Sequence, residues 1–171
     1  DAITLGVAQQ PYPGVTWQLA YTRTRSTEVS PLTSSVANSN WAARSIFNPN
    51  EDVAARSAYE IRDRVSGTLN FEKALFGKLK STFGVTYEGR RGKTYSWTYF
   101  NDLSGDGQAG NDLMYIPSAF GSGEVKFASV AEEQRFWDIV NQFPELRTSA
   151  GKVVGRNSGT APWVSNCDSP R

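Results

Sequence analysis

Polar and apolar residues alternate along two neighbouring segments of the chain, residues 59–72 and 79–88. Because successive side chains of a strand point to opposite faces, each segment predicts a β-strand with one apolar and one polar face. The apolar face carries Val65, Leu69, Phe83 and Val85. A soluble sandwich would turn its polar face to water, whereas a transmembrane barrel would turn it to the lumen.

The same alternation predicts a strand over residues 15–25, but residues 1–14 are weakly patterned and indicate at most a strand end at Ile3–Val7. Residues 26–58 are rich in Ser, Asn and Pro and predict one long loop. Beyond Gly89 the chain changes character, although Tyr95, Trp97 and Tyr99 still alternate.

A helix is predicted over residues 129–143. Ser129 and Glu132 have the spacing of a capping box, and Phe136, Ile139 and Val140 recur at helical spacing. Pro144 is expected to end this helix. The tail from Thr148 is rich in Gly, Ser and Asn and predicts no further complete strand.

The connections between these strands differ greatly in length. Residues 73–78 form one short turn, whereas the other connections run for tens of residues. Short turns at one end, long loops at the other and strands of about 9–11 residues or more are typical of transmembrane barrels. Aromatic residues make up 12% of the chain and gather near strand ends, as in the girdles of such barrels or in an ordinary β-core.

The composition removes several kinds of chemistry. The 171 residues include no histidine, which excludes Ser-His-Asp catalysis and histidine-ligated metals. No paired-carboxylate or nucleophile arrangement stands out, and we predict no enzymatic activity. A single cysteine, Cys167, allows no disulfide within the chain. The formal net charge of +1 gives no field that would attract nucleic acid. No apolar run approaches the length of a transmembrane helix, and no signal peptide is visible.

Six stretches, taken in order, resemble the barrel region of the Oar-like TonB-dependent outer-membrane receptors. They are Val29–Ser35, Phe47–Glu51, Tyr59–Arg64, Tyr87–Trp97, Asn101–Gly107 with Asn111–Pro117, and Arg156–Trp163. The resemblance extends from about Val15 to Trp163, which is nearly the whole chain.

The resemblance implies an all-β fold: residues 1–171 would be a partial antiparallel transmembrane β-barrel of the bacterial outer membrane. The turn at 73–78 would face the periplasm, and a strand over 79–99 would run outward from it. The long segments, with one short helix, would be extracellular loops. The expected partners are the rest of the barrel, its plug, the TonB complex and outer-membrane lipid. The plug, the TonB-contacting segment, the signal peptide and the closing strand have no counterpart in these residues.

The polar face supplies the first candidate site. We expect six charged side chains to face the lumen, where they could line a substrate path or bind a plug: Glu60, Arg62, Arg64, Glu72, Lys80 and Glu88. The alternative is that these charges pair across strands. Asp63 is a charge on the predicted lipid face, so we expect it near the outer interface or turned inward by a bulge.

The second candidate is a calcium loop. Asp102, Ser104 and Asp106 stand at the first, third and fifth positions of an EF-hand-type loop, and Gly107 allows its sharp turn. The carbonyl of Gln108 would be the next ligand, but the final Glu is replaced by Leu113, with Asp112 one residue early. The alternative is an Asp/Gly turn whose side chains bond their own backbone.

Arg90, Arg91 and Lys93 beside Tyr95, Trp97 and Tyr99 have the residue types of a nucleic-acid stacking platform, but three charges are too few. We therefore expect no nucleic-acid partner. Two functions remain open: a segment of an energised TonB-dependent transporter for an unidentified ligand, or a soluble extracellular β-rich binding module with a calcium-stabilised loop.

Overall fold

The computed structural model describes residues 1–77 and 79–168. The fold is mostly β, with 41% strand and 14% helix. The chain forms two compact units. We call the first, residues 1–26, 59–93 and the described residues from Thr160 on, the sheet unit, and the second, residues 27–58 and 94–159, the loop unit.

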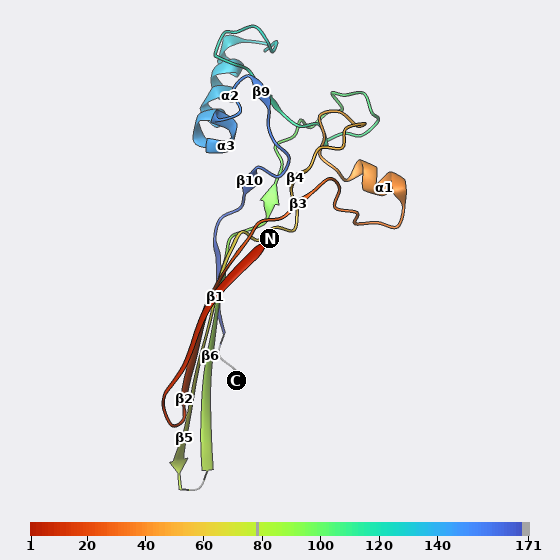
Figure 1. Ribbon diagram of the computed structural model, residues 1–171. Coiled ribbons are helices and arrows are strands. Elements are labelled where there is room, and N and C mark those ends of the chain that lie inside the picture. The colour runs from red at the N-terminus through yellow and green to blue at the C-terminus, as the bar shows by residue number, and fades with distance from the viewer. Residues whose placement is uncertain (78, 169–171) are drawn as a thin grey trace. The chain divides into compact units, whose positions relative to one another are not determined.

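The sheet unit is one antiparallel five-stranded sheet in the order β1-β2-β5-β6-β11. Its strands are β1 (Ala2–Tyr12), β2 (Val15–Thr24), β5 (Asp63–Phe76), β6 (Leu79–Arg90) and β11 (Val164–Asp168). Figure 1 shows β1, β2, β5 and β6 running side by side. These four strands have 10 to 14 residues, about twice the usual strand length.

Two short turns lie at the same end of the sheet (Figure 1). β1 joins β2 through Pro13 and Gly14, and Gly14 adopts φ 82°. A Cβ at Gly14 would meet the backbone of Glu72, whose N–H donates to the Gly14 carbonyl at 2.6 Å, so this turn requires glycine. The turn between β5 and β6 contains Gly77 at φ 61°. The connections from β2 to β5 and from β6 to β11 leave the other end and are long, as expected.

β1 was expected only as a strand end over Ile3–Val7, but it is a complete strand. Its apolar residues Ile3, Leu5 and Val7 alternate with Thr4, Gly6 and Ala8. Small residues and Pro11 obscured this pattern. Within the described sheet β1 has only β2 as a neighbour, and proline is tolerated on such an edge strand.

The bounds of the two predicted long strands need correction. β5 begins at Asp63 rather than at residue 59 and continues to Phe76, so most of the predicted turn at 73–78 is strand. Position 78 lies outside the described residues. β6 ends at Arg90, and β7 (Thr94–Tyr95) is a separate short strand, so the expected strand over 79–99 is interrupted. The tail supplies β11, a strand that the pattern did not predict.

The loop unit contains short strands, apart from Thr160 at the end of β10, and they pair as β3 with β4, β8 with β9, and β7 with β10. Their bounds are β3 (Thr27–Glu28), β4 (Ala55–Arg56), β8 (Tyr115–Ile116), β9 (Lys152–Val153) and β10 (Gly159–Thr160). Its helices are α1 (Ala37–Ala42), α2 (Val130–Gln142) and α3 (Pro144–Arg147), which replace the single short helix expected.

The predicted helix is confirmed as α2. The Ser129 hydroxyl accepts the Glu132 N–H at 3.2 Å and caps its first turn. Pro144 follows the end of α2, and it also begins α3, where its missing N–H costs nothing. Among the described residues no helix combines the length and apolar character needed to cross a membrane.

The core of the loop unit forms where α2 and α3 meet β8 and the residues after β9. Ile116, Val140, Leu146 and Val154 are each at most 1% exposed. Trp97 packs against this cluster and lies 4.7 Å from the Phe143 ring, centroid to centroid. The aromatic residue that was expected to continue a long strand is therefore a core residue of the loop unit.

Candidate functional site

The register of the sheet unit separates two chemically different faces. Leu5 pairs with Tyr21, Tyr21 with Val65, and Leu69 with Val85, so large apolar residues lie in rows across the strands. Most side chains in these rows remain exposed, with 69% for Leu5, 48% for Leu69 and 61% for Phe83, whereas Val65 is half-buried. The apolar face comprises Ile3, Leu5, Val7, Trp17, Leu19, Tyr21, Val65, Leu69, Phe71, Phe83, Val85 and Tyr87. Such a continuous exposed apolar surface marks an interaction site.

Four of the six predicted charged residues lie on the opposite, polar face. Lys80 Nζ is 2.7 Å from Glu72 Oε1, and Arg64 Nη2 is 3.2 Å from Glu88 Oε1. Arg90, which stands opposite Arg64 in the register, is also 3.7 Å from Glu88. The charges of this face therefore pair across strands, which is the alternative that the sequence left open.

Glu60 and Arg62 do not share this face, because β5 begins only after them. The Glu60 side chain is buried, and its Oε2 accepts the Ser26 N–H at 2.8 Å. Its Oε1 lies 3.6 Å from Nε of Arg62, whose carbonyl accepts the Thr24 N–H. The prediction that Glu60 and Arg62 lie on a strand was wrong. The buried carboxylate instead accepts a backbone N–H where the chain leaves β2.

Asp63 is the first residue of β5 and lies on the apolar face opposite Arg23. The Tyr21 hydroxyl donates to its Oδ1 at 2.6 Å. The register continues regularly into Arg64, so no bulge turns Asp63 to the other face. The phenolic donor and the strand-end position opposite Arg23 stabilise the carboxylate on this face.

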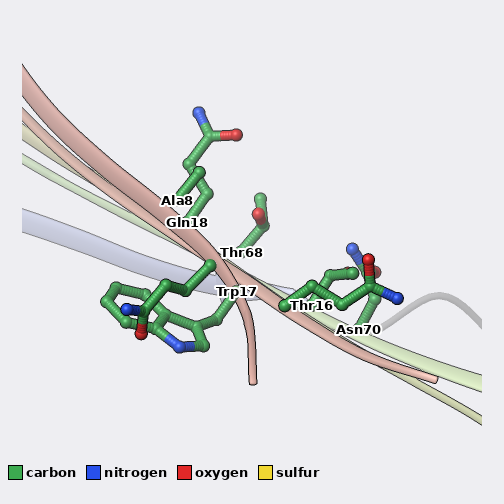
Figure 2. Close-up of a pocket in the computed structure, with 8 residues that line it drawn as sticks. Ala8, Thr16, Trp17, Gln18, Thr68 and Asn70 are labelled. Carbon is green, nitrogen blue, oxygen red and sulfur yellow. The ribbon is translucent and has the colours of Figure 1, made fainter. Parts of the chain in front are cut away.

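A shallow depression of about 330 Å³ lies on the sheet unit. Amide and hydroxyl side chains of β2 and β5 line it, among them Gln18 and Thr68, and Figure 2 shows the Trp17 indole on the other side of the strands. The remaining lining residues are Ala8, Gln9, Gln10, Thr16 and Asn70. No lining side chain is ionisable, so this surface can donate and accept hydrogen bonds but cannot transfer protons.

The Asp/Gly loop places its carboxylates against its own backbone. Asp102 accepts the N–H groups of Gly105, Asp106 and Gly107 at 2.7, 3.2 and 2.9 Å. Asp106 accepts the Gln108 N–H at 2.7 Å. This is the Asp/Gly turn that the sequence offered as the alternative to calcium.

Asp112 closes the same loop. Its Oδ2 accepts the N–H groups of Leu103 and Ser104 at 2.6 and 3.1 Å, and its side chain is 4% exposed. Burial raises the pKa of Asp112, but hydrogen bonds from the Ser104 side chain and these backbone groups outweigh burial, so its pKa is lowered. No cluster of three or more His, Cys, Asp or Glu side chains suited to a metal occurs among the described residues. Calcium at Asp102, Ser104, Asp106, Gln108 and Asp112 therefore stays a prediction.

A turn around Asn157 was not predicted as part of a site. Asn157 adopts φ 56°, a conformation that asparagine tolerates better than most residues. Its Nδ2 donates to the Arg56 carbonyl at 2.7 Å, and its Oδ1 accepts the Ser96 hydroxyl at 3.1 Å. Arg156 beside it donates from Nη2 to the carbonyls of Glu28 and Val53 at 2.8 and 3.0 Å. The only indication of this turn in the sequence was that Arg156–Trp163 is one of the six stretches that resemble the receptor family.

Comparison with protein families, with curated proteins and with solved structures finds no match to this chain. The functional argument therefore depends on the residues and on the geometry of the two units.

Proposed function

We propose that this chain forms part of the wall and of the outward loops of a TonB-dependent outer-membrane transporter. The sheet unit contributes wall strands, with the apolar face toward lipid and the polar face toward a water-filled lumen. The loop unit captures a ligand, which then passes through the barrel after plug movement energised by the TonB complex.

The exposed apolar face of the sheet unit carries this proposal. Each square ångström of apolar surface removed from water contributes about 25 cal/mol, so a sheet with this face in water would be strongly disfavoured. Lipid would cover the face completely. The four long strands have 10 to 14 residues, which suffices for tilted strands to cross a bilayer.

The polar face fits the inside of such a wall. Cross-strand ion pairs such as Glu72–Lys80 and rows of threonine and amide side chains keep their hydrogen bonds in water. The same groups facing lipid would be costly, particularly the arginines and lysine. The chemistry of the two faces therefore supports an orientation with the apolar face toward lipid and the polar face toward the lumen.

The strand edges support membership in a larger barrel. β11 pairs with β6 only from Thr86 to Arg90, so Leu79 to Val85 have β5 as their only strand neighbour in the described sheet. β1 likewise has a single described neighbour along its whole length. Unpaired backbone groups cost several kcal/mol each in lipid, so further strands must pair with both edges.

Site-directed labelling tests the proposal in the complete protein in outer membranes. Cys167, which is exposed, is first replaced by serine. Single cysteines then carry an environment-sensitive fluorophore at Val65, Leu69, Phe83 and Val85, and a lipid-borne quencher is added. We expect strong quenching at all four positions.

Thr68 and Thr86 provide matched controls, since they pair with each other next to the Leu69–Val85 pair but on the opposite face. Labels there should respond to a water-soluble quencher and not to the lipid-borne one. Protection of the four apolar positions from both quenchers would instead establish a covered protein core and favour the soluble binding module.

A further inference from the structure

The loop unit contains a pocket of about 540 Å³, a volume that suits a small organic ligand. Its walls are mainly apolar and come from the segment before β4, from Leu113 and from the chain around β9. Phe47 and Val53 are 60% and 54% exposed, so apolar surface remains uncovered at this pocket. The other apolar lining residues are Ala54, Ala55, Leu113, Val153 and Val154.

Charge at the pocket is mainly positive. Arg56 and Arg156 line it, whereas Glu51 is its one acidic lining residue. Arg44 adds a further positive charge close enough to act on Arg156. Burial, and then the charge of Arg44, lower the pKa of Arg156, while Glu28 and Glu51 act in the opposite direction.

The Arg156 side chain is held in place by hydrogen bonds from only one of its three nitrogen atoms. Both of its hydrogen bonds come from Nη2 and end on the carbonyls of Glu28 and Val53. Neither Nε nor Nη1 donates to another residue in the described parts of the chain, and no carboxylate lies within ion-pair distance there. A guanidinium oriented by backbone contacts, with free donors beside an apolar wall, is suited to bind a carboxylate.

From this combination we infer that the pocket binds a small ligand in which an apolar body ends in a carboxylate. The apolar body would cover Phe47, Val53 and Val153, and the carboxylate would pair with Arg156. The assignment deepens the proposed function, because it gives the ligand class of the capturing unit and rests on that function for its role. The pocket chemistry itself can be measured independently of the membrane.

Fluorine NMR of the complete protein in lipid nanodiscs tests the inference, with empty nanodiscs as the background. The probe is 4-(trifluoromethyl)phenylacetate, and its primary amide is a neutral analogue of the same size. We expect the carboxylate to bind about tenfold or more tightly than the amide, since a charge-assisted hydrogen bond is lost in the amide. Equal affinity of the two probes would overturn the inference.

Two variants locate the binding. Arg156→Gln should abolish the preference for the carboxylate while the amide binds as before. Ala54→Trp fills the pocket without removing a contact of Arg156 and should lower the affinity for both probes. This variant therefore tests binding in the pocket even if Arg156→Gln unfolds the loop unit. Arg135→Gln on α2 lies outside the pocket lining and should change neither affinity.

Retained carboxylate preference in a folded Arg156→Gln protein, or unchanged binding in Ala54→Trp, would contradict the inference. The labelling experiment on the apolar face separates this failure from failure of the proposed function. If the labels on the apolar face are accessible to lipid but the two probes bind equally, only the inferred ligand class is overturned. If the carboxylate probe is preferred but the labels are shielded from lipid, only the transporter proposal is overturned.

Discussion

The Tyr21 hydroxyl donates a 2.6 Å hydrogen bond to Oδ1 of Asp63 at one end of the apolar face of the sheet. Tyr21 is in β2, and Asp63 begins the neighbouring β5. A carboxylate on an apolar surface is stabilised by such a donor, and its place at a strand end keeps it away from the middle of the strand. The pair therefore explains how this carboxylate is accommodated at a strand end, where Arg23 lies opposite it on the same face.

We predict that Tyr21→Phe lowers the urea midpoint of unfolding of the protein in lipid, because Asp63 then loses its donor. The double variant Tyr21→Phe with Asp63→Val removes the donor and the acceptor together, so it should lose less stability than the sum of the two single variants. Urea titrations of the parent, both single variants and the double variant measure the coupling. Additive effects of the two substitutions would argue against the pair.

Glu88 has a special position on the polar face, because it pairs with both Arg64 and Arg90. These two arginines stand opposite each other in the register, so Glu88→Gln leaves like charges side by side. We expect a loss of up to about 1 kcal/mol in low salt, shrinking as salt screens the repulsion.

Glu72→Gln is the matched control, since it leaves only the single partner Lys80. Denaturation at low and high ionic strength should show the larger salt dependence for Glu88→Gln. The same salt dependence in both variants would mean that the Arg64–Arg90 repulsion is unimportant.

Local signals predicted part of this fold well. α2 was predicted because its cap at Ser129 and its apolar spacing lie within one short stretch. β2, β5 and β6 were predicted because alternation is visible wherever large apolar residues mark one face. β1 was missed since Gly6 and Ala8 blur the contrast between its faces and Pro11 suggests a loop.

The remaining features depend on contacts between distant parts of the chain. Arg156 binds the Glu28 carbonyl across 128 residues, and no periodicity encodes such a contact. Glu60 fits the polar register of a strand, yet it lies before the start of β5 at Asp63. Its carboxylate accepts the Ser26 N–H instead. The pocket of the loop unit is formed by segments that are far apart in the sequence, so the sequence pattern could not predict that its lining residues lie together.

The cap of α2 gives a direct test of local stability. Ser129→Ala removes the acceptor for the Glu132 N–H and should destabilise the helix by about 1 kcal/mol. Ser129→Asp restores an acceptor and should remain near the parent. Hydrogen–deuterium exchange of residues 129–137 measures both, and unchanged protection in Ser129→Ala would contradict the assigned cap.

The Asp/Gly loop should stay folded without calcium, because Asp102 already accepts three backbone N–H groups. We expect equal exchange protection of residues 101–112 in chelator and in millimolar calcium. Asp102→Ala should lose protection in both, at a cost of about 1 kcal/mol. Protection that rises with calcium in the parent, but not in Asp106→Ala, would instead establish the predicted calcium site.

Asp112 makes the same loop sensitive to acid. Its hydrogen bonds to Leu103 and Ser104 stabilise the charged form, so the pKa of Asp112 in the folded loop is below its unfolded value. The stabilisation is fully present above the ordinary Asp pKa of about 3.9 and is lost as the pH falls through the folded pKa. Protection of residues 101–112, corrected for intrinsic exchange, should therefore be constant from neutral pH to about 5 and decline below about 4.

Two variants identify Asp112 as the group responsible. Asp112→Asn should be less protected than the parent at neutral pH, and the difference between them should shrink in acid, where the parent also loses its charge. Ser104→Ala removes the side-chain donor but keeps the backbone N–H, so it raises the folded pKa and moves the decline to higher pH. A difference between parent and Asp112→Asn that stays constant into strong acid would show that the Asp112 charge does not stabilise the loop.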